Sequence, residues 1–209
     1  MPGKKNAESE PVSDLARRDE EIRIATVGER APLNSTIHLA AYDPTWPSMF
    51  AREAVRIREV LGERVLLLEH VGSTSVPGLC AKPVIDMILA VKNSADEASY
   101  GPALESEGYA LRIREPDWYE HRCFKLSRFD GNLHIFSAGC PEIDRMLLFR
   151  DWLRREEGDR LLYEGTKRKL AAQKWEFTQH YADAKSKIVK EILARASDAL
   201  ADLGLTTWV

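Results

Sequence analysis

Two short apolar runs on either side of a loop constrain the fold most. They read RVLLLEHV (64–71) and VIDMILAV (84–91), and the loop between them contains two glycines and two prolines. Each run is continuous, is flanked by Gly or Pro, and is far shorter than the ~18–20 residues that cross a bilayer. We therefore predict two buried strands that lie side by side in one sheet, with one acid, Asp86, inside the second.

The rest of the chain switches between helical and strand-like patterns. Apolar residues at near-helical spacing predict a helix over 47–61 that ends at Gly62, and Ser94 with Glu97 indicates a capping box at the start of a helix over 94–108. Strand-like alternation predicts four further strands, at 36–42, 109–115, 121–128 and 132–139. The DGN turn at 130–132 suits a hairpin between the last two strands.

Helical spacing returns at Pro141 and continues to about Leu203, with helices predicted around 143–153, around 159–170 and from Lys174 onward. The predicted fold is α+β, with a mixed β-sheet flanked by helices and a C-terminal helical segment. Three parts are expected: a disordered or extended N-terminal arm (1–35), an α/β core (36–140) and a C-terminal helical segment packed on the core (141–203).

The composition argues against several classes of function. The 209 residues include 30 Lys and Arg against 33 Asp and Glu, a net charge of −3, and no basic stripe is visible, which argues against nucleic-acid binding. The three cysteines lack metal-ligand spacing and suit a reduced compartment. Because no apolar stretch resembles a signal peptide or a membrane span, we expect a cytoplasmic protein that does not enter a membrane.

The loop between the two apolar runs is a candidate phosphate and metal site. Gly72 and Ser73 combine a flexible turn, a hydroxyl and free backbone N–H groups, which together let a phosphate approach the backbone. Lys82 stands before the second run, where it either binds phosphate or neutralises Asp86. An acid inside an apolar run is costly unless it is paired or binds a cation.

Several motifs, in this order, resemble the GrpB (UPF0157) family. They are YDPTWPSMF (42–50), HVGSTSVPGLCAKPVIDMILAV (70–91), NLHIF (132–136), FRDWLR (149–154) and YADAKSKI (181–188). The resemblance runs from Ile37 to Ala196. It implies the nucleotidyltransferase fold of the DNA polymerase β superfamily for the core, and members of the family also occur fused behind dephospho-CoA kinases.

Enzymes of that superfamily place a Gly-Ser turn before a strand with two acids at alternate positions, and these carboxylates hold divalent cations at the triphosphate. In this sequence Asp86 matches one acid, whereas Val84 or Ile88 stands at the position of the other. His134 lies near the position of a third acid. The resemblance therefore implies Asp86 and His134 as ligands of one Mg²⁺ or Mn²⁺, and Asp86, His134 and Lys82 as the catalytic candidates.

The resemblance also implies a set of residues that bind a nucleoside triphosphate. The turn contributes part of the set, a later strand contributes an arginine, and the C-terminal helices contribute two residues that match those covering the nucleotide in related enzymes. The set is Gly72, Ser73, Thr74, Ser75, Arg122, Tyr181 and Lys185.

Functions of different classes follow from these residues. The first is a Mg²⁺-dependent transfer of a nucleotidyl group from a nucleoside triphosphate to a small-molecule acceptor, with His134 as a ligand or general base. The second is a catalytically degenerate protein that binds a nucleotide or another anion, or assists a partner protein such as a CoA-related one. An enzyme of altered chemistry built on Asp86, Lys82 and His134 is a third hypothesis.

Overall fold

A five-stranded mixed sheet forms the centre of the computed structural model, which describes residues 14–30, 32–202 and 204. The strand order is β1-β2-β5-β4-β3, in which β2 and β5 run parallel and the other neighbours run antiparallel. The strands are β1 (Leu67–Val71), β2 (Ile85–Val91), β3 (Ala110–Glu115), β4 (His121–Lys125) and β5 (Gly131–Ser137). The predicted α+β class is confirmed.

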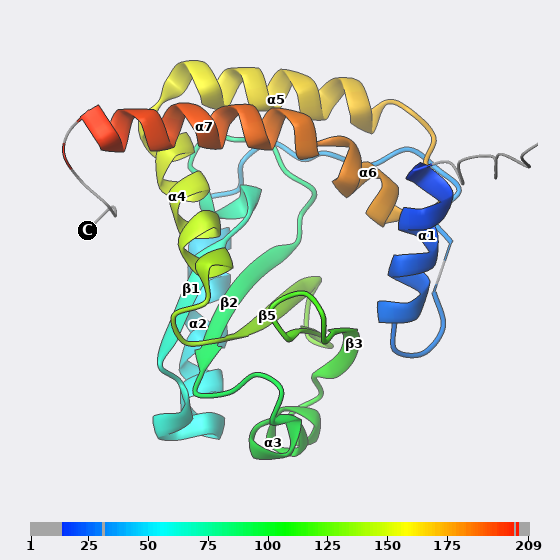
Figure 1. Ribbon diagram of the computed structural model, residues 1–209, viewed down its shortest axis with the longest axis vertical. Helices are drawn as coiled ribbons and strands as arrows, with labels where there is room; N and C mark the ends of the chain where they lie inside the picture. The colour runs from blue at the N-terminus through cyan, green and yellow to red at the C-terminus, as the bar shows by residue number, and fades with distance from the viewer. Residues whose placement is uncertain (1–13, 31, 203, 205–209) are drawn as a thin grey trace, which may run out of the picture.

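Seven α-helices surround the sheet within the described residues. They are α1 (Asp14–Ala25), α2 (Trp46–Leu61), α3 (Gly101–Ser106), α4 (Pro141–Arg155), α5 (Glu157–Ala171), α6 (Thr178–Ala184) and α7 (Ser186–Asp202). In Figure 1, α5 and α7 lie side by side across one end of the molecule, and α1 lies apart beside α6. None of the helices in this part of the chain has the length and apolar character needed to cross a membrane.

The two faces of β2 are covered by different helices. Met87 and Leu89 point to one face and pack in a cluster with Ile57 of α2. Ile88 and Ala90 point to the other face, where their cluster includes residues at the start of α4. Because side chains alternate along a strand, Asp86 shares the α4 face with Ile88. The acid therefore lies on the sheet face that looks toward the C-terminal helices.

A separate apolar cluster joins the helical layer to the loop after β1. Trp152 of α4, Tyr163 of α5 and Ile192 of α7 pack together against Val76 and Leu79 of that loop. This cluster fixes the position of the helices relative to the segment that follows Gly72, and it creates the space between the helical layer and the sheet that the candidate site occupies.

Two predictions for the N-terminal part are wrong. Residues 14–25 form α1 rather than a disordered or extended arm, since this stretch is rich in helix-forming Ala, Leu, Arg and Glu; residues 1–13 lie outside the described part. The segment 36–42 is not a strand. It makes a single bridge from Ala40 to Ala81, and its Ile37 packs against Ala171 and Tyr181 instead of a sheet.

Two predicted helix starts are also wrong. The segment 94–108 contains a 3-10 turn and the short α3, because Gly101 and Pro102 delay the helix, and Ser94 hydrogen-bonds Ser137 rather than capping. The helix predicted from Lys174 begins at Thr178, because Trp175 bridges to Ser35, and Lys185 then separates it from α7. The boundaries of the three predicted parts stay a prediction.

Candidate functional site

The turn after β1 brings the chain directly against Asp86. Gly72 has a φ of 69°, a conformation that side chains other than glycine rarely adopt. A Cβ atom at this position would lie 2.6 Å from Asp86 Oδ2, so both the backbone angle and the close contact require glycine. The Gly-Ser turn and the acid, which the loop separates in the sequence, are therefore neighbours in the folded protein.

Two of the three hydroxyl groups in this turn have internal partners. Thr74 Oγ1 donates to the Val84 carbonyl at 3.0 Å and lies 3.0 Å from His70 Nε2. Ser75 Oγ donates to the Gly72 carbonyl at 2.6 Å. The Ser73 hydroxyl, which is partly exposed, has no hydrogen-bond partner among the described residues. Thr74 and Ser75 therefore shape the turn, and Ser73 is the hydroxyl that can meet a ligand.

The parallel pairing of β2 with β5 places three polar side chains together. Asp86 lies opposite Asn132, whose Nδ2 donates to Asp86 Oδ1 at 2.7 Å. His134 Nε2 lies 3.9 Å from the same oxygen. Burial raises the pKa of Asp86. The contacts with His134 and Asn132 and the positive charge of Lys185 outweigh this effect, so the net pKa lies below its usual value. Asp86 is thus an ionised carboxylate with its charge already neutralised in part.

A chain of hydrogen bonds continues from His134 to the edge of the sheet. His134 Nδ1 lies 3.0 Å from His121 Nε2, and His121 Nδ1 lies 2.7 Å from Glu115 Oε2. Since the Glu115 carboxylate accepts the His121 Nδ1–H, and burial lowers the pKa of His121, the neutral His121 Nε2 accepts from His134. This arrangement directs Nε2 of His134 toward Asp86.

His134 itself carries a positive charge in this setting. Burial lowers the pKa of the His134 imidazole, but the Cys123 sulfur and the Asp86 carboxylate beside it act the other way, and the net pKa lies well above its usual value. Asp86 and His134 therefore form an ion pair on the floor of the site. The structure brings together these two predicted residues.

The residues around Asp86 do not fit a two-ion centre. The described residues contain no group of three or more His, Cys, Asp or Glu side chains that could hold a metal ion. Val84, just before β2, and Ile88, within it, stand two residues on either side of Asp86 and are buried and apolar, so Asp86 is the lone carboxylate on this part of the chain. One ion could take Asp86 as a ligand, but it would need its remaining ligands from water and phosphate.

A cavity of about 920 Å³ opens over the same sheet face. Part of its lining consists of Lys82, Lys125 and the two neighbours of Asp86, Asn132 and His134. Lys125 donates to Asp130, and more weakly to Asn132 Oδ1 at 3.3 Å. Lys82 forms no ion pair with Asp86 in the described part of the chain, where Asn132 and His134 satisfy that acid instead. Lys82 therefore lines the cavity as a cation that is not paired with Asp86.

Arginines of α4 hold the turn in place. Arg150 Nη1 donates to Glu69 Oε2 at 2.7 Å and to the His70 carbonyl at 3.0 Å. Arg154 donates to the Ser75 carbonyl through Nε at 3.1 Å and Nη2 at 2.9 Å. These bonds connect the helical layer to both ends of the Gly72 turn. The two arginines of the FRDWLR motif therefore stabilise the turn by donating to the carbonyls of His70 and Ser75.

Lys185 and Tyr181 reach the site from the junction of α6 and α7. The Lys185 Nζ atom lies 4.6 Å from the centre of the Tyr181 ring, and its charge helps to lower the pKa of Asp86. Tyr181 is buried. Lys185 therefore faces the space between the helical layer and the Asp86 face, while Tyr181 forms part of its support.

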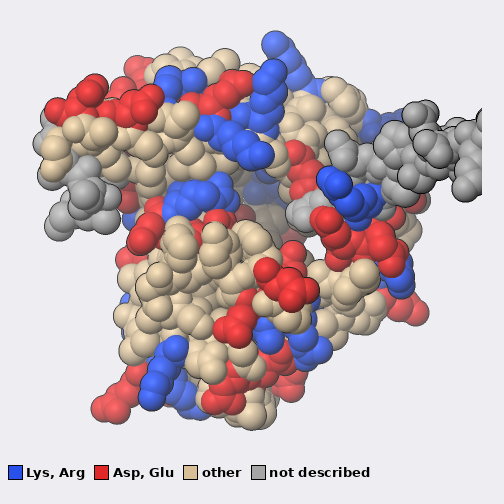
Figure 2. Space-filling model, in the orientation of Figure 1, with Lys and Arg blue, Asp and Glu red and all other residues tan. Residues whose placement is uncertain are grey.

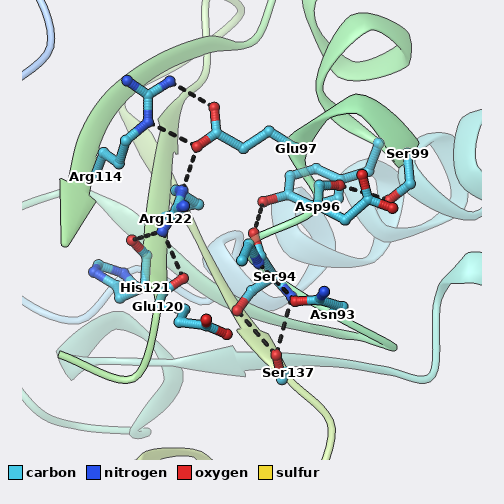
Figure 3. Close-up of polar contacts among 12 residues, drawn as sticks. Asn93, Ser94, Asp96, Glu97, Ser99, Arg114, Glu120, His121, Arg122 and Ser137 are labelled. Carbon is cyan, nitrogen blue, oxygen red and sulfur yellow. Dashed lines mark hydrogen bonds and ion pairs between the residues drawn. The ribbon is translucent and has the colours of Figure 1, made fainter. Parts of the chain in front are cut away.

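Arg122 lies away from the other predicted residues. Its neighbours in the strand show that it points to the α2 face, and its Nε donates to Glu97 Oε1 at 2.5 Å (Figure 3). Arg114 binds the same carboxylate at 2.7 and 2.6 Å. Arg122 is buried in this ion pair, so we leave it out of the candidate site.

Comparison with known proteins places this arrangement in a family. The model of the GrpB protein family matches residues 36–195. The chain belongs to the GrpB family. It is 62% identical over 181 residues to a UPF0157 protein of Halalkalibacterium halodurans, which covers 87% of this chain and 93% of that protein. It is 40% identical over 183 residues to a UPF0157 protein of Streptomyces coelicolor, covering 88% and 95% of the two chains.

A solved GrpB structure has the same fold. The crystal structure of the conserved protein GrpB from Enterococcus faecalis matches with a TM-score of 0.65 and 29% identity, covering 78% of this chain and 98% of that one. Among longer proteins, the dephospho-CoA kinase of Mycolicibacterium paratuberculosis is 30% identical over 167 residues, which cover 66% of this GrpB-family chain and 40% of the kinase. The nucleotidyltransferase resemblance stays a prediction.

The sequence reasoning missed two polar residues: Asn132, which contacts Asp86, and Lys167, which is buried against the loop after β1. Asn132 stands two residues before His134, so strand alternation alone could have placed it on the same face, next to Asp86. Lys167 lies on the buried side of α5, four residues after Tyr163 and four before Ala171. That i, i+4 spacing is a signal that the lysine faces inward.

Proposed function

We propose that this GrpB-family protein binds a nucleotide or a similar phosphate ester on the Asp86 face of its sheet, as an anion and without a two-ion metal centre. The Gly72 turn supplies backbone N–H groups and the Ser73 hydroxyl, and Lys82 and Lys185 supply positive charge. Asp86 and Asn132 fix the floor of the site. From the turn the ligand would extend into the cavity of about 920 Å³ that Lys82, Asn132 and His134 line, a size suited to a small organic molecule.

One observation carries this proposal: the Asp86 carboxylate already has a cationic partner. His134 Nε2 lies 3.9 Å from Asp86 Oδ1, and Asn132 Nδ2 donates to the same oxygen at 2.7 Å. A metal ion would have to compete with both groups. With Lys185 close by, the positive groups around this one acid favour an incoming anion over a cation.

A second candidate function is Mg²⁺-dependent nucleotidyl transfer. It is favoured by the close approach of Asp86 Oδ2 to Gly72, since a phosphate bound at the turn would then lie beside this acid. Asp86 would be the protein ligand of one ion, which would supply charge stabilisation at the phosphate. In this case His134, directed toward Asp86 by His121, would hold or accept a proton at Nε2.

Titration calorimetry separates the two candidates. We would titrate ATP, GTP and dephospho-CoA, the last because of the kinase relatives, into the wild-type protein and Asp86→Asn, each with Mg²⁺ and with EDTA. The amide introduced by this substitution keeps an acceptor for Asn132 and removes one negative charge. Under our proposal ATP binds in EDTA, and Asp86→Asn binds it as tightly or up to about 10-fold more tightly, because repulsion of the phosphate is reduced.

The matched control is Asp198→Asn, an exposed position on α7, which should leave binding unchanged. Binding that requires Mg²⁺ and disappears in Asp86→Asn would contradict metal-free binding and support the transferase. Absence of binding by the wild-type protein, with or without Mg²⁺, would overturn both functions.

A further inference from the structure

A buried lysine lies behind the candidate site. The Lys167 side chain, on α5, is about 1% exposed, and its Nζ donates to the Cys80 carbonyl in the loop after β1. The Tyr163 ring lies 5.2 Å from the same atom. Among the described residues, no carboxylate lies within ion-pair distance of Lys167. It is therefore a buried ammonium group without an acidic partner.

Such a group is costly to keep. An ammonium has three N–H donors, and the Cys80 carbonyl accepts from one of them. Burial lowers the pKa of Lys167 to about 7, with Cys80 acting in the opposite direction and the positive charge of Lys185 acting with burial. A buried lysine with a single protein acceptor is a candidate ligand group, because a bound anion would accept from its remaining donors and supply the missing negative charge.

A second unsatisfied group lies next to it. Tyr181 is 4% exposed, and its hydroxyl has no hydrogen-bond partner in the described part of the chain. Cys80 and Tyr163, which both contact Lys167, are also close enough to Tyr181 to raise its pKa together with burial. The Tyr181 hydroxyl, which lacks an acceptor, and the Lys167 side chain, which lacks an acidic partner, thus both lie near Cys80 and Tyr163.

Lys185 connects this pair to the Asp86 face. It lies over the Tyr181 ring, and its charge acts on both Lys167 and Asp86. Lys185 and Tyr163 also line a groove of about 1020 Å³ along α4 and α7, so two direct neighbours of the buried pair lie at the surface of this groove. Figure 2 shows a hollow between the helical layer and the sheet, with Lys and Arg side chains along its upper rim.

We propose that Lys167, Tyr181 and Lys185 form a subsite for the terminal phosphates of the bound ligand. A phosphate there accepts hydrogen bonds from the two ammonium groups and from the Tyr181 hydroxyl, and its charge offsets the buried Lys167. The subsite rests on the proposed function, because the first phosphate of the same ligand would lie at the Gly72 turn. It names the ligand class as a nucleoside di- or triphosphate rather than a monophosphate.

The test compares AMP, ATP and inorganic tripolyphosphate by calorimetry in EDTA. Lys167→Met keeps a side chain of similar length without charge, and Tyr181→Phe removes one hydroxyl. Each should weaken ATP and tripolyphosphate by about 10- to 100-fold, the effect of losing a charge-assisted hydrogen bond, and change AMP by less than about 2-fold. Lys169→Met, exposed on the same helix, and Tyr119→Phe are the matched controls.

The outcomes separate this subsite from the proposed function. Nucleotide binding that both variants leave unchanged would overturn the subsite while the proposed function stands. Tripolyphosphate binding that Lys167→Met abolishes, without any binding of AMP or ATP, would support the subsite and overturn the nucleotide proposal. If the wild-type protein binds none of the three, both are wrong. Thermal melting without ligand shows that Lys167→Met is folded, since removing an unpaired buried charge should not lower its melting temperature.

Discussion

Two buried basic side chains in this protein differ in whether they have an acidic partner. Arg122, on the α2 side of the sheet, is 5% exposed and donates to Glu97, which a second arginine also binds. Lys167, in the helical layer, is 1% exposed and has a backbone carbonyl as its partner. The charge of Arg122 is balanced by a carboxylate, whereas Lys167 has no acidic partner among the described residues.

This difference shows how stability and binding divide between the two regions. A buried charge with its partner in place is part of the folded structure, and removing either member is destabilising. A buried charge without a partner lowers stability, and sites that bind ligands commonly carry such a penalty. Arg122 and Lys167 should therefore respond to the same substitution with changes of opposite sign.

The largest effect is expected for Arg122→Met. It would leave Glu97 partly buried with one arginine, and two backbone carbonyls, at residues 120 and 121, would lose their donor. We expect a loss of about 3–5 kcal/mol in the free energy of unfolding, measured by urea denaturation. Arg114→Met removes the more exposed partner of the same acid and should cost less than about 1 kcal/mol. Similar small losses in both variants would remove the contrast with Lys167.

His70 is a third buried base, and it avoids the problem by staying neutral. Burial lowers its pKa to about 4, with Asp86 opposing this and the arginines of α4 adding to it. The unfolded chain binds this proton near pH 6.5 and the folded chain near pH 4. Stability from His70 is therefore complete above about pH 6.5 and is lost as the pH falls to about 4, by about 3 kcal/mol.

Urea denaturation at about pH 7 and about pH 4.5 checks this prediction. His70→Gln can keep the contact with Thr74 and cannot take up the proton, so its stability should fall about 2–3 kcal/mol less over this range than that of the wild-type protein. His38→Gln, at an exposed position, should follow the wild-type curve. Equal acid sensitivity of all three proteins would show that His70 is not buried as a neutral base.

The smallest change in stability is expected for Lys167→Met. We expect a gain of about 1–3 kcal/mol at about pH 6, since the buried charge is removed. The unfolded chain holds this proton up to about pH 10.5 and the folded chain up to about pH 7. The contribution of Lys167 to stability is therefore lowest below about pH 7, where both states hold the proton and the folded state holds it at a cost. This contribution rises as the pH rises from about 7 to about 10.5, because the unfolded chain binds more protons than the folded chain in that range. A variant that is less stable than the wild type at this acidic pH would show that Lys167 supports the fold.

The sequence contained enough information for the sheet and for the floor of the site. The apolar run around Asp86 and the alternation in 132–136 predicted that both residues lie on strands, and the resemblance to the GrpB family implied that Asp86 and His134 share a site. In the structure His134 Nε2 lies 3.9 Å from Asp86 Oδ1. The segment 36–42 also alternates, yet it forms no strand, because Ile37 packs against Tyr181 and Ala171 of the helical layer. The alternation of apolar residues in a segment does not show whether they will pack in a sheet or against a helix.

The charged partners could not be predicted in the same way. Arg122 and Glu97 are separated by 25 residues, and nothing near either one shows that they meet. The unpaired state of Lys167 depends on the absence of an acid across the space between α5 and the loop after β1. The spacing of Lys167 on its helix predicts that the side chain points inward. Which residues lie opposite it depends on how the whole chain folds.

The cavity over the sheet has walls of two different origins. At the Asp86 end its lining, with Lys82, Asn132 and His134, falls within the residues 36–195 that the GrpB family model matches. At the other end α1 contributes a wall, which a bridge from Thr26 to Ile113 and the bond from His180 to Asp19 keep in place. Because α1 (Asp14–Ala25) lies outside the matched residues, the family model accounts for the charged wall of this cavity and not for the wall that faces it.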